Sequence, residues 1–250
     1  MSHSILFTTV IVETKAEILY PFNVLHAIIF DFNGIIVNDE PIHLELFQKV
    51  LEEKGLSLSK DDYYERYLGL DDRGCFQLAY REHNRPLDDS LLNELIERKA
   101  RLYLESIQQG IAIFPGVQEL LPPLSSRYPL AIASGALRHE IETILRAMGL
   151  RECFQVIVSA EDVTHGKPSP EIFLKALSRL NDASGRSRLI SPAECLVIED
   201  SREGISGAHR AGIKCLAVTN SHPAEELAHA DAIVKGLNEV TVSFLESLVD

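Results

Sequence analysis

The chain has 250 residues, of which 46% are hydrophobic and 24% charged, and its formal net charge is −13. This length accommodates one large domain or a core with an inserted lobe, and the hydrophobic fraction is enough to build a buried core. Nucleic acid and anionic membranes attract basic surfaces, so a chain this acidic is expected to bind neither. Any bound phosphate must be neutralised locally, by a lysine, a metal ion or helix N-termini.

The chain has four cysteines, at Cys75, Cys153, Cys195 and Cys215. They form no Cys-x-x-Cys pair and no metal-ligand spacing, so the simplest interpretation is reduced, mostly buried thiols in a cytoplasmic protein. No apolar run approaches the length of a membrane span. The apolar stretch at 5–12 lacks the basic region of a signal peptide, and we assign no role to the N-terminal extension, residues 1–25.

The first clear element is the apolar run Ala27 to Phe30, which leads directly into Asp31 and a turn at Asn33-Gly34. A run this short and this rich in branched residues predicts a buried parallel strand. Asp31 then lies at the carboxyl end of that strand, where open α/β sheets place their chemistry. A carboxylate there can act as a nucleophile, a metal ligand or both.

Helical patterns follow this strand. One helix is predicted from about Pro41 to Lys54, and Asp39 or Glu40 can cap it. Residues of about 56–110 show apolar positions at helical spacing and no strand candidate, which indicates a small helical lobe inserted into a core. The expected units are a core of residues 26–40 and 111–250 and a helical domain of residues 41–110.

Beyond about residue 114, strand and helix patterns alternate, which predicts a doubly wound parallel sheet, that is, a Rossmann-like α/β core. The predicted strands are Leu130–Ala133, Phe154–Val158, Leu196–Ile198, Cys215–Val218 and Ala232–Val234. The predicted helices lie around His139–Met148, Pro170–Leu180, Gly204–Ala211 and Glu225–Ala228.

Polar groups fall directly after four of the predicted strands. Because the carboxyl ends of parallel strands share one edge, we expect these groups to converge on one crevice. Carboxylates are hard oxygen ligands for Mg²⁺, a serine beside backbone N–H groups can hold phosphate oxygens, and a lysine adds a compact positive charge. Phosphoryl transfer needs this combination. The groups are Asp31 and Asn33, Ser134 and Gly135, Lys167, and Glu199 and Asp200.

Four ordered motifs resemble those of the haloacid dehalogenase superfamily: Phe30-Asp31-Phe32-Asn33-Gly34, Ala133-Ser134-Gly135, Gly166-Lys167-Pro168-Ser169-Pro170-Glu171 and Ile198-Glu199-Asp200-Ser201. The similarity covers roughly residues 26–240 and is greatest to the beta-phosphoglucomutase-like and phosphoglycolate-phosphatase-like branch. It implies that Asp31 is a nucleophile that forms an aspartyl-phosphate and that the helical domain is a cap over the substrate. The implied Mg²⁺ ligands are Asp31, the backbone carbonyl of Asn33, Glu199 and Asp200; the implied phosphoryl-binding residues are Ser134, Gly135 and Lys167.

Two further residues match elements of the family on the cap side. His43 aligns with a histidine near the site entrance, and Arg73 follows Leu68-Gly69-Leu70-Asp71-Asp72, which resembles the substrate-specificity loop. The resemblance implies that both residues bind substrate. A surface helix histidine and a solvated arginine are equally good interpretations of these two positions.

Asn33 departs from the family pattern, in which the residue two positions after the nucleophile is an aspartate that exchanges protons with the leaving group and water. An amide cannot exchange a proton near neutral pH, and loss of a general acid–base group costs roughly 10²–10⁴-fold in rate. Three explanations stay open: a naturally slow or specialised phosphatase, an engineered substitution, or a binding or regulatory protein on the same fold.

We therefore expect a cytoplasmic, Mg²⁺-dependent phosphatase that acts on a small phosphorylated metabolite, as a monomer or weak homodimer. A catalytically impaired ligand-binding protein and a beta-phosphoglucomutase-like phosphotransferase are the alternatives. Ala136 and Leu137 stand where a bisphosphate-using mutase should have polar groups, which favours hydrolysis. Members that remove halogen work without Mg²⁺, and members that cleave phosphonates need a cap lysine that the loop Leu68 to Arg73 lacks.

Overall fold

The structure is a computed structural model that describes residues 24–68, 70–185 and 188–249. Most of the N-terminal extension discussed above, residues 1–25, therefore lies outside the described residues. Within them, no helix combines the length and apolar character needed to cross a membrane.

A six-stranded parallel sheet forms the core, with the strand order β5-β4-β1-β6-β7-β8. The order reverses beside the central strand β1, as in other doubly wound folds. The strands are β1 Ala27–Phe30, β4 Leu130–Ala133, β5 Val156–Val158, β6 Cys195–Glu199, β7 Lys214–Val218 and β8 Ala232–Val234. The predicted parallel α/β sheet is confirmed.

Helices cover both faces of the sheet because successive side chains of a buried strand point to opposite faces. The helices of the core are α5 Val117–Ser125, α6 Arg138–Ala147, α7 Glu171–Ser184, α8 Arg202–Arg210 and α9 Val242–Ser247. Ile29 and Ala131 belong to an apolar cluster with α7 and α8, whereas Phe30 and Ile132 pack in a second cluster with α5 and α6.

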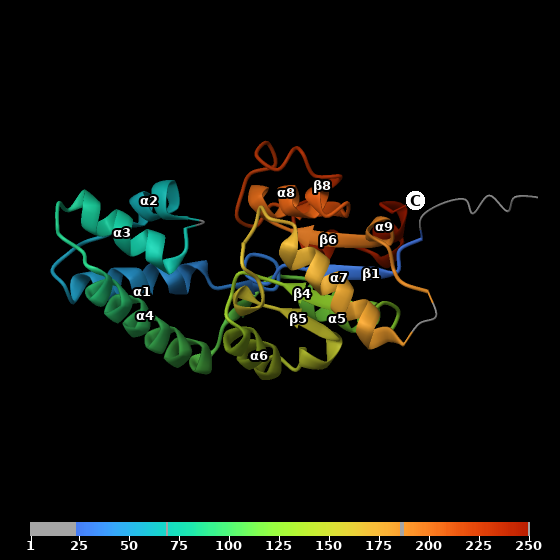
Figure 1. Ribbon diagram of the computed structural model, residues 1–250, viewed down its shortest axis with the longest axis horizontal. Coiled ribbons are helices and arrows are strands. Elements are labelled where there is room, and N and C mark those ends of the chain that lie inside the picture. Colours follow the sequence, from blue (N-terminus) through green and yellow to red (C-terminus); the bar gives the residue numbers. More distant parts are fainter. Residues whose placement is uncertain (1–23, 69, 186–187, 250) are drawn as a thin grey trace, which may run out of the picture.

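A helical lobe stands to one side of the sheet (Figure 1). It is joined to the core near a short antiparallel pair, β2 Val37–Asn38 and β3 Ala112–Ile113. Its long helix α4 packs on α1 and α3. The helices of the lobe are α1 Glu40–Glu52, α2 Lys60–Asp62, a π-helical turn Tyr63–Tyr67, α3 Asp72–Glu82 and α4 Asp89–Gln109.

One predicted helix is wrong. The segment around Glu225–Ala228 forms successive turns instead, in which Glu226 N donates to Pro223 O and Leu227 N donates to Ala224 O. The segment buries Leu227 alone among its neighbours, too little apolar surface to stabilise a helix by packing. Helix α5 was missed, because Pro122 and Pro123 within it are unfavourable in helix interiors.

Candidate active site

Asp31 is placed by the central strand. Its backbone N–H donates to Ile198 O at 3.0 Å, which fixes the end of β1 against β6. The chain then turns sharply, with Gly34 at φ +80° and its N–H donating to Val37 O. A Cβ on Gly34 would lie 1.8 Å from Asp200 Oδ2, so the turn passes directly over the neighbouring strand end. Only glycine fits this combination of left-handed backbone and close approach.

Lys167 forms two buried ion pairs. Its Nζ lies 2.7 Å from Asp31 Oδ1 and 2.5 Å from Glu199 Oε1, and the lysine side chain is 14% exposed. Salt bridges of this kind hold the charged form of each partner in place. The ammonium group therefore ties the ends of β1 and β6 to the loop that precedes α7.

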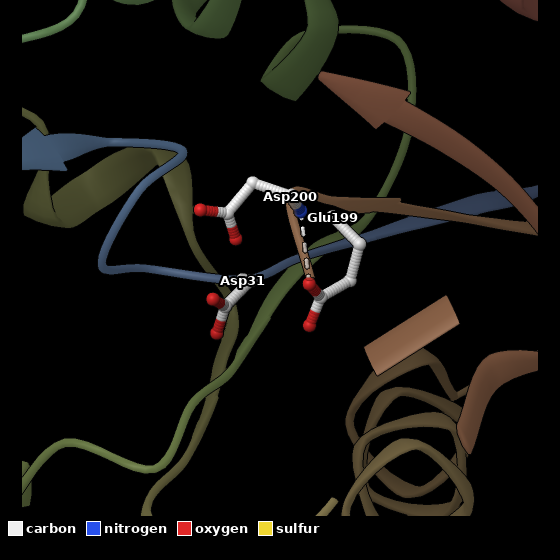
Figure 2. Close-up of side chains that lie close together, drawn as sticks. All are labelled: Asp31, Glu199 and Asp200. Carbon is white, nitrogen blue, oxygen red and sulfur yellow. Dashed lines mark hydrogen bonds between the residues drawn. The ribbon is translucent and has the colours of Figure 1, made fainter. Parts of the chain in front are cut away.

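The Glu199 carboxylate is fully buried and held by three further donors. Its Oε2 accepts hydrogen bonds from Asp200 N, Ser201 N and Ser201 Oγ at 2.8–2.9 Å. A Cβ on Gly204, in the first turn of α8, would lie 1.9 Å from this carboxylate. The Asp200 side chain points away from that of Glu199 (Figure 2), and its Oδ2 accepts a hydrogen bond from Ser221 Oγ.

The side chains of Asp31, Glu199 and Asp200 gather beyond the ends of β1 and β6 (Figure 2). One oxygen from each lies within 4.8 Å of the other two. Burial raises the pKa of Asp31 to about 6 against the opposing charge of Lys167. Burial and the two neighbouring carboxylates raise the pKa of Asp200 well above its ordinary value. For Glu199, burial acts upward, but the charge and hydrogen bond of Lys167 hold its pKa below the usual range.

This site fits a hard divalent cation. Three buried carboxylates face the single ammonium group of Lys167, so negative charge is in excess at the site. Each of these three side chains offers an oxygen atom to a metal ion. The backbone carbonyl of Asn33 follows Asp31 by two residues in the same turn. The residues that could hold the ion are Asp31, Asn33, Glu199 and Asp200.

Ser134 lies at the end of β4 and reaches the same edge of the sheet. Its side chain is buried, its Oγ donates to Asn33 Oδ1 at 3.4 Å, and it accepts from Ala136 N at 3.1 Å. Gly135 follows with open space around its Cα, since an added Cβ would meet nothing within 4 Å. The structure thus brings Ser134 beside the turn that follows Asp31, and it leaves room next to Gly135.

The side chain of Asn33 is held by a residue whose role was not predicted. Asp39 is 1% exposed, and its Oδ2 accepts hydrogen bonds from Asn33 Nδ2, from His43 Nε2 at 3.1 Å and from Tyr103 OH at 2.8 Å. Asp39 does occupy the N-cap position of α1, but its side chain makes no capping bond. Burial acts to raise the pKa of Asp39, yet these hydrogen bonds and the nearby His43 lower it.

Lys99, in the middle of α4, was also missed. It is 2% exposed and contacts His43 Nδ1 at 2.8 Å and Asp72 Oδ1 at 2.5 Å. Its ammonium group also lies 4.2 Å from the centre of the Phe47 ring. The sequence offered one signal, a lysine four residues before Tyr103 on the apolar face of a helix. That signal is ordinary in surface helices, so it does not mark a buried cation.

Arg73 contacts the first two turns of α4. Its side chain is 47% exposed, donates to Asn93 Oδ1 at 3.2 Å and lies 3.9 Å from Asp89 at the start of α4. Tyr103, the α4 residue that contacts Asp39, is ten residues beyond Asn93 on the same helix. The substrate-binding role of Arg73 stays a prediction.

Residues 28–218 match the family model for haloacid dehalogenase-like hydrolases, and the chain belongs to this family. A phosphorylated carbohydrates phosphatase from Thermotoga maritima is 32% identical over 194 residues, which cover 76% of this chain and 83% of that protein. A chloroplastic 5-amino-6-(5-phospho-D-ribitylamino)uracil phosphatase from Arabidopsis thaliana is 28% identical over 225 residues. That match covers 89% of this chain but only 57% of the relative's length.

Solved structures show the same fold. A mutant of CbbY from Rhodobacter sphaeroides, in complex with xylulose-(1,5)bisphosphate, superposes with a TM-score of 0.77 at 25% identity. The match covers 89% of this chain and 99% of that chain. The helical lobe is therefore the cap of a haloacid dehalogenase-like fold.

Proposed function

We propose that the protein is a Mg²⁺-dependent phosphatase that hydrolyses a small phosphorylated metabolite through an aspartyl-phosphate on Asp31. The observation that carries this proposal is the convergence of Asp31, Lys167 and the Glu199–Asp200 pair at one edge of the sheet. The related phosphatases act, by their names, on phosphorylated carbohydrates and on a phosphoribitylamino compound, and the CbbY mutant binds a sugar bisphosphate. A sugar phosphate or a similar small phosphate ester is the substrate class that agrees best with the names of these relatives.

Each residue has a defined task in this mechanism. The Asp31 carboxylate attacks phosphorus, and the bond from phosphorus to the leaving oxygen breaks. Lys167 and Ser134 hold the oxygens of the transferring phosphoryl group, and Lys167 also keeps Asp31 ionised and oriented. When bound at Asp31, the Asn33 carbonyl, Glu199 and Asp200, Mg²⁺ supplies charge stabilisation for the phosphoryl oxygens. Water then hydrolyses the aspartyl-phosphate.

Asn33 limits this cycle because its amide neither gives a proton to the leaving oxygen nor takes one from water. The side chain instead donates to Asp39 and accepts from Ser134, which holds the turn after Asp31 in place. We therefore propose a slow phosphatase with an intact metal and phosphoryl site. The same residue favours the second candidate, a ligand-binding or regulatory protein that retains the phosphate site without turnover.

The remaining proposals concern the domain organisation, the cellular location and the oligomeric state. The helical lobe, residues 41–110, would act as the cap that covers the substrate, and the core would comprise residues 26–40 and 111–250. The four cysteines are free thiols, which supports a cytoplasmic location. We propose a monomer or weak homodimer.

A turnover screen separates the two candidate functions. Small phosphate esters, both alkyl and aryl, are incubated with the protein and with Asn33→Asp, with Mg²⁺ or with EDTA, and phosphate release is measured. A phosphatase shows Mg²⁺-dependent release that rises in Asn33→Asp. Background rates for every ester in both proteins would favour the ligand-binding candidate.

A further inference from the structure

A continuous chain of polar side chains runs from Asn33 into the helical lobe. Asn33 Nδ2 and His43 Nε2 both contact Asp39 Oδ2, and His43 Nδ1 lies 2.8 Å from Lys99 Nζ. Lys99 is in turn paired with Asp72 at 2.5 Å. The chain thus links the position where the family carries its acid–base group to a buried cation on α4.

The contacts of His43 define where its proton lies. An ammonium group has only donors, so Lys99 donates and His43 Nδ1 accepts. The ring of a neutral histidine then carries its hydrogen on Nε2, which donates to Asp39 at 3.1 Å. Stacking on Tyr103, with ring centroids 4.9 Å apart, holds the imidazole in this orientation.

Among Asp39, His43 and Lys99, His43 is the group open to a substrate. Asp39 is 1% exposed and Lys99 is 2% exposed, whereas the His43 side chain is 26% exposed. The titratable groups in and around the cluster of Asp39, His43 and Lys99 come from four helices. Asp39 and His43 belong to the start of α1, Asp72 to α3, Lys99 and Tyr103 to α4, and Glu140 to α6. Because His43 Nε2 and Asn33 Nδ2 contact the same oxygen, Asp39 Oδ2, the exposed Nε2 lies next to the position where the family carries its acid–base group.

We propose that Lys99 and His43 form a proton relay that carries the acid–base chemistry which Asn33 cannot perform. The proposal rests on the phosphatase function above. As Asp31 forms its bond to phosphorus, the leaving oxygen takes the Nε2 proton of His43, and Nδ1 takes a proton from the Lys99 ammonium. In the second half, water loses a proton to Nε2 as it attacks the aspartyl-phosphate, and the Nδ1 proton returns to the Lys99 amine. Both residues end each turnover in their starting state.

The relay predicts that kcat depends on His43 more strongly when residue 33 is asparagine than when it is aspartate. His43→Gln keeps an amide donor for Asp39 but cannot pass a proton, so it separates proton transfer from hydrogen bonding. With an alkyl phosphate, we expect His43→Gln to lower kcat by roughly 10²-fold in the Asn33 protein. In the Asn33→Asp background the same change should lower kcat by less than about tenfold, because the introduced carboxyl group supplies the acid and base. An aryl phosphate, whose leaving group needs no proton, should show a smaller loss in the formation of the aspartyl-phosphate.

Lys99→Arg tests directly whether Lys99 supplies the proton that His43 receives. Arginine keeps the positive charge next to Asp72 and His43 but does not deprotonate in proteins. The relay predicts that Lys99→Arg loses alkyl phosphate turnover as His43→Gln does, whereas a purely electrostatic or positioning role predicts retained turnover. Thermal unfolding of each variant identifies those that are folded, and His83→Gln, on the outer end of α3, is the matched control with unchanged kcat.

The outcomes distinguish this inference from the function it rests on. Equal losses from His43→Gln in both backgrounds, or full turnover by Lys99→Arg, would overturn the relay and leave the phosphatase function standing. Absence of Mg²⁺-dependent turnover in both the Asn33 and the Asn33→Asp proteins would overturn the phosphatase function and the relay with it.

Discussion

Replacing the proposed nucleophile should stabilise the metal-free protein. Burial raises the pKa of Asp31 from 3.8 to about 6, so the ionised carboxylate favours the unfolded chain. A shift of this size corresponds to about 3 kcal/mol, because each pKa unit is worth about 1.4 kcal/mol. Asparagine has the shape of the protonated acid, and Lys167 keeps its second partner, Glu199. We therefore expect Asp31→Asn to raise the free energy of unfolding by about 2–3 kcal/mol at pH 8, or roughly 4–12 °C in Tm.

The gain must depend on pH in a defined direction. When folding raises the pKa of a carboxyl group, its ionisation lowers the free energy of unfolding. This loss is absent below the pKa of the unfolded chain, 3.8, and complete above the pKa of the folded protein, about 6. The stability difference between Asp31→Asn and the parent should be near zero at about pH 4 and complete above about pH 7. Urea unfolding in EDTA across this range measures it, with exposed Asp61→Asn as the control. A variant less stable than the parent at pH 8, or a gain independent of pH, would refute the reasoning.

Two other changes test the metal site. Asp200→Ala should lower Mg²⁺ affinity in calorimetry by at least about tenfold, because it removes one of the proposed carboxylate ligands; unchanged affinity would assign these acidic residues another purpose. Gly34→Ala should destabilise the protein by at least about 1–2 kcal/mol and weaken Mg²⁺ binding, since its Cβ would meet Asp200 Oδ2 at 1.8 Å in a left-handed backbone. Gly166→Ala, where a Cβ meets nothing within 4 Å, is its control, and equal effects of the two would contradict the close approach.

The sheet and the polar groups at its edge could be predicted from the sequence because both depend on local pattern. Each core strand is an apolar run followed at once by a polar residue, so the ends of β1, β4 and β6 were visible in the sequence. Parallel topology then places those ends together. The same local reasoning failed where packing overrides propensity. Pro122 and Pro123 lie within a helix that the sheet and its neighbours stabilise through Leu120, Leu121 and Leu124.

The polar chain behind Asn33 could not be predicted in this way. The sequence around Asp39 is typical of a helix cap, and that around Lys99 is typical of a solvated helix lysine, because both residues are ordinary in those positions. Their contacts depend on how α1 and α4 pack, with Asp39 and Tyr103 separated by 64 residues and His43 and Lys99 by 56. Only the packed lobe shows that these two charges are buried and share His43.

The measurement that tests the central claim most directly compares Asn33→Asp with the double variant Asp31→Asn/Asn33→Asp in rapid-quench phosphate release. With Mg²⁺ and an alkyl phosphate, we predict that Asn33→Asp raises turnover by roughly 10²–10⁴-fold, toward the lower end if the relay operates. The double variant should show none, because it lacks the proposed nucleophile. An aryl phosphate should show a smaller rise, and the aspartyl-phosphate should persist longer in the Asn33 protein. Equal background rates in Asn33→Asp and the parent, or turnover that survives Asp31→Asn, would contradict phosphoryl transfer to Asp31.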